Sequence, residues 1–142
     1  MTVPAQTGKE ESRKLATVSL VVRDYDEAIA WYREKLGFLL IEDADLGEGR
    51  RWVVVAPDLR DGARLLLAKA KNDGELARVG DQTGGRVAFF LETNDFRRDY
   101  KSMRDRGVEF REEPRQEAYG TVAVFTDLYG NLFDLIEIRQ GR

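Results

Sequence analysis

Two carboxylates in apolar segments are the side chains best placed to do chemistry in this chain. Asp134 lies inside the run LFDLIE (132–137), and Glu92 ends the run RVAFFLE (86–92). Histidine and cysteine are both absent from the 142 residues, which excludes imidazole bases, Ser-His-Asp triads, thiol nucleophiles and cysteine-held metal clusters. Asp134 could therefore act as a base or accept a hydrogen bond from a cationic or hydroxylated ligand. Both carboxylates are also compatible with structural roles, Asp134 beside an arginine and Glu92 in solvent.

Other side chains on the same strands have types that suit a small-molecule site. Strict alternation puts Thr17 and Ser19 on one face of the first strand, where their hydroxyls could bind a ligand. Phe90 shares a face with Glu92 and offers an aromatic surface, and Arg86 could bind a carboxylate or phosphate group. Trp52 is a further aromatic candidate, but the following run VVV (53–55) leaves its facing side open. Each of these residues could equally serve packing or solvation.

The overall charge and hydropathy pattern excludes several classes of partner. Lys and Arg number 23 against 26 Asp and Glu, a formal net charge of −3, so a basic nucleic-acid-binding surface is not expected. No apolar run approaches the roughly 18–20 residues that span a bilayer. The polar first 14 residues lack the apolar segment of a signal peptide. We expect a globular cytoplasmic protein that binds neither nucleic acid nor membranes.

The first half of the chain predicts a strand, a helix and three more strands. Asp24 is placed to cap a helix that ends at Gly37, and Glu27 completes a capping-box pattern. The strands are expected at about 15–22, 38–45, 51–56 and 63–69. Residues 1–14 have no apolar period and predict a flexible arm. Residues 70–84 predict a polar connector with one helical turn around 75–79, which either covers a binding site or only links the two halves.

The second half repeats this order of elements. A helix is expected from a cap at Asn94 or Asp95 to Gly107, with strands at about 86–92, 108–113, 120–126 and 131–138. Equivalent residues lie at nearly constant offsets, which are 71 for Asp24 and Asp95, 70 for Gly37 and Gly107, and 68 for Gly62 and Gly130. The same order repeated at this offset indicates an internal duplication. The expected fold is α+β, with two tandem βαβββ modules.

Two segments carry a family resemblance. The runs VSLVVRDYDEAIAWYREKLGF (18–38) and FTDLYGNLFDLIE (125–137) resemble the two signatures of the glyoxalase/bleomycin-resistance/dioxygenase family, the vicinal oxygen chelate superfamily. Leu128 and Tyr129 replace the usual Pro and second Asp of the second signature. The resemblance covers about 15–138 and implies a single domain, with modules at about 15–69 and 85–138 whose sheets curl into a U-shaped cleft. It also implies a homodimer, with the cleft formed either within one chain or across the dimer.

The resemblance also locates the metal-ligand positions of the family, which usually carry His or Glu. They fall on Thr17, Leu66, Ala88 (or Arg86 if the register shifts by two) and Asp134. Only Asp134 has a suitable donor, so we expect no metal and no cofactor. Because Glu92 shares the face of Ala88, a site with two carboxylates stays open. The replacements argue against glyoxalase I chemistry and extradiol ring cleavage, both of which depend on that metal.

The expected function is metal-independent binding of a small organic molecule in the apolar cleft. Asp134, Thr17 and Ser19 would supply the polar contacts, and the remaining candidates are Leu66, Arg86, Ala88, Phe90 and Trp52. One alternative is a glyoxalase-related lyase, isomerase or dioxygenase that uses Asp134 and Glu92 as acid and base or as unconventional metal ligands. Another is a regulatory or structural domain without a ligand.

Overall fold

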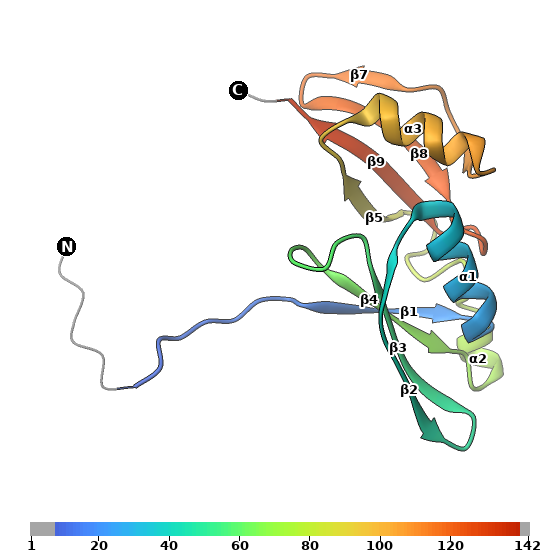
Figure 1. Cartoon of the computed structure of the whole chain (residues 1–142). Coiled ribbons are helices and arrows are strands. Elements are labelled where there is room, and N and C mark those ends of the chain that lie inside the picture. Colours follow the sequence, from blue (N-terminus) through green and yellow to red (C-terminus); the bar gives the residue numbers. More distant parts are fainter. Residues whose placement is uncertain (1–7, 140–142) are drawn as a thin grey trace.

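In the computed structural model, which describes residues 8–139, the chain forms two separate β-sheets from two successive units (Figure 1). The first unit consists of β1 (Thr17–Val22), α1 (Tyr25–Leu36), β2 (Leu39–Gly47), β3 (Arg50–Ala56) and β4 (Arg64–Lys69). The second consists of β5 (Val87–Glu92), α3 (Phe96–Asp105), β6 (Glu109–Phe110), β7 (Arg115–Glu117), β8 (Gly120–Thr126) and β9 (Leu132–Ile138). Between them lies the single turn of α2 (Asp73–Leu76), two residues before the predicted turn at 75–79.

Both sheets have the same topology. Sheet A has the strand order β1-β4-β3-β2, and sheet B has the order β5-β9-β8-β6, with β7 also paired to β8. In each sheet the first strand of the unit runs parallel to the last, while the other neighbours are antiparallel. This repetition confirms the predicted α+β class with two βαβββ modules. No helix among the described residues is long and apolar enough to cross a membrane.

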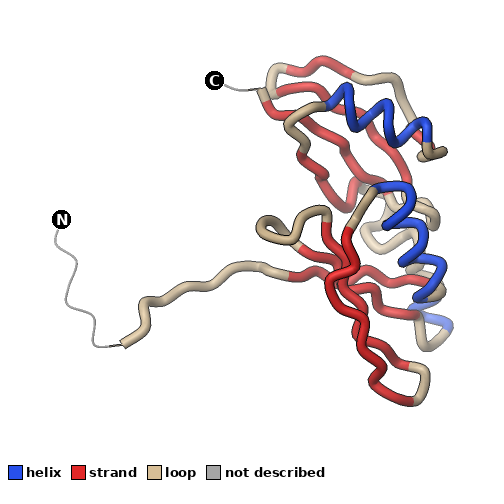
Figure 2. The backbone as a smooth tube through the Cα atoms, in the orientation of Figure 1, coloured by secondary structure: helices blue, strands red, loops and turns tan. Residues whose placement is uncertain are grey.

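Each sheet has one face covered by helices and one face without them. In β1, Leu20 and Val22 are fully buried beneath α1, whereas Thr17 and Ser19 point to the opposite side and are exposed. Figure 2 shows the strands in two groups, with α1 and α3 along the same side of the molecule. We call the sides of sheets A and B that face away from these helices the open faces. The period-two alternation of the sequence predicts the two sides of β1 correctly.

The helix-covered faces share one continuous apolar core. Tyr32 of α1 is completely buried, and its ring centroid lies 6.2 Å from that of Phe133 in β9. Phe133 in turn packs at 5.0 Å against both Phe89 and Phe125. Burying each such side chain stabilises the fold by about 1.5–3 kcal/mol. α1 therefore contacts both sheets and fixes one unit against the other.

The N-terminal cap of α1 differs from the predicted capping box. Asp24 caps the helix as expected, since its Oδ2 accepts a hydrogen bond from the backbone N–H of Glu27 at 2.9 Å. The reciprocal bond is replaced, because the Glu27 carboxylate binds Arg23 and the hydroxyl of Tyr129. The backbone N–H of Asp24 donates to that hydroxyl instead, at 3.4 Å. A residue of the second module thus completes the cap of the first.

The strand predicted at 108–113 is divided in the structure. Only Glu109–Phe110 and Arg115–Glu117 pair with β8, because Pro114 has no backbone N–H and the chain bulges between the two pieces. The Glu112 carboxylate fills the gap by accepting the backbone N–H of Val124 at 3.0 Å. Sequence periodicity cannot reveal this side-chain substitute for a ladder bond.

The connector is attached along the outer edge of β1. The side-chain amide of Gln82 accepts from the N–H of Val21 at 2.9 Å and donates to the carbonyl of Ser19 at 2.7 Å. Nearby, Gly80 packs so closely that an added Cβ would lie 2.0 Å from the Tyr129 carbonyl oxygen. These contacts favour the linking role among the two roles left open by the sequence. They also protect part of an exposed sheet edge.

The segment before β1 contains no helix or strand from residue 8 to residue 16, and it extends away from the sheets (Figure 1). Residues 1–7 of the predicted flexible arm lie outside the described residues.

Candidate functional site

Most of the side chains singled out by the sequence lie on the open faces. Thr17, Ser19, Trp52 and Leu66 belong to the open face of sheet A, and Ala88, Phe90, Glu92 and Asp134 to that of sheet B. Arg86 precedes β5 and is exposed. Because β1 and β5 are edge strands of different sheets, the two groups form two surfaces of one chain.

Asp134 has an unusual environment on the open face of sheet B. The parallel register places it opposite Phe90 of β5, and the antiparallel register opposite Val124 of β8. Asp134 is only 9% exposed, and its Oδ1 is buried without a hydrogen-bond partner among the described residues. A buried polar group without a partner costs about 1–3 kcal/mol of stability. Such a cost is typical of a functional site rather than of a plain strand residue.

A charged cluster borders Asp134 on the same face. Arg115 of β7 pairs with Val122 of β8, which places its side chain on the open face. Its Nε donates to both carboxylate oxygens of Glu112 at 3.0 Å, and its Nη1 donates to Glu117 at 2.5 Å. None of these three residues was predicted from the sequence as part of the site. The alternation of the segment RQE (115–117) across the turn at Ala118–Gly120 could have indicated the facing side of Arg115.

Burial and two charged neighbours both act on the pKa of Asp134. Burial raises the pKa of Asp134, the positive charge of Arg115 lowers it, and the negative charge of Glu112 raises it further, with a net increase. The hydrogen bonds that Arg115 donates to Glu112 and Glu117 raise the pKa of Arg115, which remains a cation. The carboxyl group of Asp134 is therefore costly to ionise. Arg115, the neighbouring cation, donates no hydrogen bond to it.

The open face of sheet A carries fewer charged groups near the predicted residues. Ser19, Leu66 and Val54 form one row across β1, β4 and β3. Trp52 lies on the open face because it is two residues from Val54 in β3, and 41% of its surface is exposed. Its indole N–H donates to Glu42 at 3.2 Å. This face offers two apolar side chains, a hydroxyl and an exposed aromatic ring.

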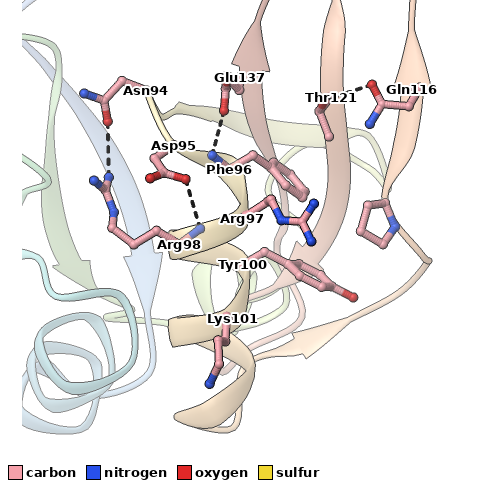
Figure 3. Close-up of a pocket in the computed structure, with 11 residues that line it drawn as sticks. Asn94, Asp95, Phe96, Arg97, Arg98, Tyr100, Lys101, Gln116, Thr121 and Glu137 are labelled. Atoms are coloured by element: carbon pink, nitrogen blue, oxygen red, sulfur yellow. Dashed lines mark hydrogen bonds between the residues drawn. The ribbon is translucent and has the colours of Figure 1, made fainter.

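The opposite side of sheet B contains a groove. It has a volume of about 890 Å³ and lies between α3 and strands β7–β9, as Figure 3 shows. Its lining consists of Asn94, Asp95, Phe96, Arg97, Arg98, Tyr100, Lys101, Pro114, Gln116, Thr121 and Glu137.

Two backbone N–H groups at the start of α3 already donate hydrogen bonds within the protein. The backbone N–H of Phe96 donates to Glu137 at 2.7 Å, and that of Arg98 donates to the capping Asp95 at 3.1 Å. Two of the backbone donors at the start of the helix are thus used internally. None of the residues predicted for the site lines the groove.

Comparison with known proteins decides the family. A sequence model of the Glyoxalase/Bleomycin resistance protein/Dioxygenase superfamily matches residues 14–135. The chain belongs to this superfamily. It is 50% identical over 129 residues to an uncharacterised protein of Shewanella frigidimarina, covering 90% of this chain and 96% of that protein.

Two solved structures of the superfamily fold are similar to this chain. UcmS2 has a TM-score of 0.77 at 32% identity, with 89% of this chain and 98% of that chain covered. TnmS3 of Streptomyces sp. CB03234, described as an antibiotic binding protein, has a TM-score of 0.71 at 25% identity, with 92% and 100% covered. Both similarities extend over nearly the whole fold, so the predicted resemblance is confirmed.

The metal site of the superfamily does not fit this chain. The ligand positions that the resemblance implies fall on Thr17, Leu66, Ala88 (or Arg86) and Asp134, and only one of these side chains is a carboxylate. From residue 8 to residue 139, no group of three or more Asp, Glu, His or Cys side chains is arranged to hold an ion. A hard divalent cation needs several oxygen ligands, and a softer one needs imidazole or thiolate. This donor set supports neither.

Proposed function

We propose that this protein binds a small organic molecule on the open face of sheet B and does so without a metal ion. The observation that carries the proposal is the buried, unpartnered Oδ1 of Asp134 beside the exposed ring of Phe90. Ligand sites are mainly apolar surfaces with a few polar groups that fix orientation. The similarity to TnmS3, described as an antibiotic binding protein, supports the same class of function.

In this proposal each side chain has a defined part. A flat ring of the ligand stacks on Phe90, and a donor group of the ligand binds Asp134. Ala88 leaves space beside Phe90 because its side chain is a single methyl group. Glu92 lies farther along β5, opposite Ile136, and contributes negative charge at the rim.

We further propose that the protein is a homodimer in which the second copy covers the open faces. The exposed fractions of Phe90 (65%) and Trp52 (41%) are high for aromatic side chains, and β1 and β5 are edge strands. Such a dimer would bring Thr17, Ser19 and Leu66 to the ligand from sheet A. Light scattering at tens of micromolar is expected to give the mass of two chains, and the mass of one chain would contradict the dimer.

The binding proposal is tested by a ligand screen followed by titration of two variants. A hit found by thermal shift should bind Phe90→Ala and Asp134→Asn about ten- to hundredfold more weakly, since a hydrogen bond to a charged group contributes about 1.5–3 kcal/mol. Thr121→Ala, in the groove on the other side of sheet B, is the matched control and should bind normally. Unchanged affinity in both test variants, with both folded, would place the site elsewhere.

An enzymatic role has less support. The raised pKa of Asp134 suits a general acid, as a lyase or isomerase would require. Glu92, its predicted partner, faces Ile136 across the strand pair instead of Asp134 and is exposed. The binding function therefore remains our leading proposal.

A further inference from the structure

We propose that this site selects ligands that carry a positively charged nitrogen on an aromatic body. The inference rests on the proposed function and narrows it to one chemical class of ligand. It follows from the charges around Asp134 and from the position of Phe90.

Carboxylates outnumber cationic groups around Asp134 on the open face of sheet B. Three carboxylates, those of Asp134, Glu112 and Glu117, lie with one guanidinium, that of Arg115. Arg115 donates from Nε to Glu112 at 3.0 Å and from Nη1 to Glu117 at 2.5 Å. None of these bonds reaches Asp134, so the cluster has an excess of two negative charges when all three carboxylates are ionised.

The carboxylate of Asp134 has an oxygen that accepts no hydrogen bond from the described residues. Asp134 is nine-tenths buried, and its Oδ1 has no partner within residues 8–139. An ammonium or amidinium group of a ligand would supply the missing donor and the missing charge together. A charge-assisted hydrogen bond is roughly twice as strong as a neutral one, so an alcohol in the same place would gain less. A carboxylate ligand would be repelled by all three acidic side chains.

The aromatic ring of Phe90 lies beside Asp134. Phe90 is the direct register partner of Asp134 across β5 and β9, and 65% of its surface is exposed. Aromatic ring faces attract cations, by about 0.5–1 kcal/mol at exposed sites and more when water is excluded. A cation beside Asp134 would meet this ring, while the aromatic body of the ligand would pack on the apolar surface around it. Both features favour the same class of ligand.

Three probes with the same ring and different charge test the inference. They are 1-naphthylmethylammonium, 1-naphthylmethanol and 1-naphthoate, titrated into the full-length protein by calorimetry at neutral pH. We expect the ammonium probe to bind about tenfold or more tightly than the alcohol, and the carboxylate to bind most weakly. Asp134→Asn should bring the ammonium probe close to the alcohol while leaving the affinity for the alcohol nearly unchanged.

A control variant separates the local effect from net charge. Asp105→Asn changes the charge of the protein by the same amount at the end of α3, on the helix-covered side, and should leave the order of the three probes unchanged. Equal affinities for all three probes, each weakened by Phe90→Ala, would overturn the charge preference and leave the binding site standing. Failure of all three to bind at millimolar concentration would contradict the inference and the proposed function together.

Discussion

Asp127→Ala should lower the free energy of unfolding by about 3–5 kcal/mol, because it removes the common acceptor of a buried network. Asp127 is 4% exposed. It accepts the hydroxyl of Tyr32 at 2.6 Å, the side-chain amide of Asn131 at 2.9 Å, and the backbone N–H groups of Tyr129 and Asn131 at 2.9 Å each. Without the carboxylate, these donors are left inside the core without a partner. Denaturation by urea, followed by fluorescence, measures the change.

A double-mutant cycle with Tyr32→Phe shows whether the network is the cause. Alone, Tyr32→Phe should cost about 1 kcal/mol, since one neutral partner of Asp127 is lost and three remain. In the Asp127→Ala background its cost should vanish, because the hydroxyl no longer has an acceptor to lose. A loss below about 1 kcal/mol for Asp127→Ala would show that the network contributes little. Asp127 opens the stretch DLYGN (127–131) of the second family signature, whose role here is to hold α1 against sheet B.

Asp134→Asn should have the opposite effect and stabilise the ligand-free protein at neutral pH, because it removes a buried negative charge that lacks a hydrogen-bonded partner and keeps the shape of the side chain. The pKa of Asp134 is raised in the folded protein, so its ionisation opposes folding. Below the unfolded-state pKa both states are protonated and the wild type bears no cost. As the pH rises through the folded-state pKa, the cost grows to its full value.

The measurement is the difference in unfolding free energy between Asp134→Asn and wild type across that pH range. The difference should be small in acid and largest near neutral pH. Arg115 and Glu112 are the charged groups that act on Asp134 most directly, so Glu112→Gln should reduce the difference. A variant less stable than wild type at neutral pH would mean that Asp134 has a stabilising partner. Greater stability together with weaker ligand binding is the signature expected of a functional carboxylate.

The fold could be predicted from the sequence because local signals and the internal repeat agree. Caps at Asp24 and Asp95, the left-handed glycine at Gly37 and the alternation of the strands all describe short stretches of chain. They also fix which side of each strand is buried, so the placement of Thr17 and Phe90 on open faces follows from parity alone.

The surroundings of Asp134 could not be predicted, because they depend on contacts between distant segments. Glu112 and Arg115 reach Asp134 only through the bulge between β6 and β7, where Pro114 interrupts the pairing. The bond from Gln82 to the edge of β1 joins residues more than sixty positions apart and has no periodic signal. Alternation predicts which face a side chain occupies, but not which charges share that face.

The most direct test of the central claim is to map a bound ligand by amide chemical shifts in labelled protein. With a hit from the screen, we expect the largest changes at Phe90, Val124 and Asp134, on β5, β8 and β9 of sheet B. Asp134→Asn should reduce these changes at equal ligand concentration. Changes confined to the groove around Arg97, Gln116 and Thr121 would place binding on the opposite side of the sheet and contradict the account.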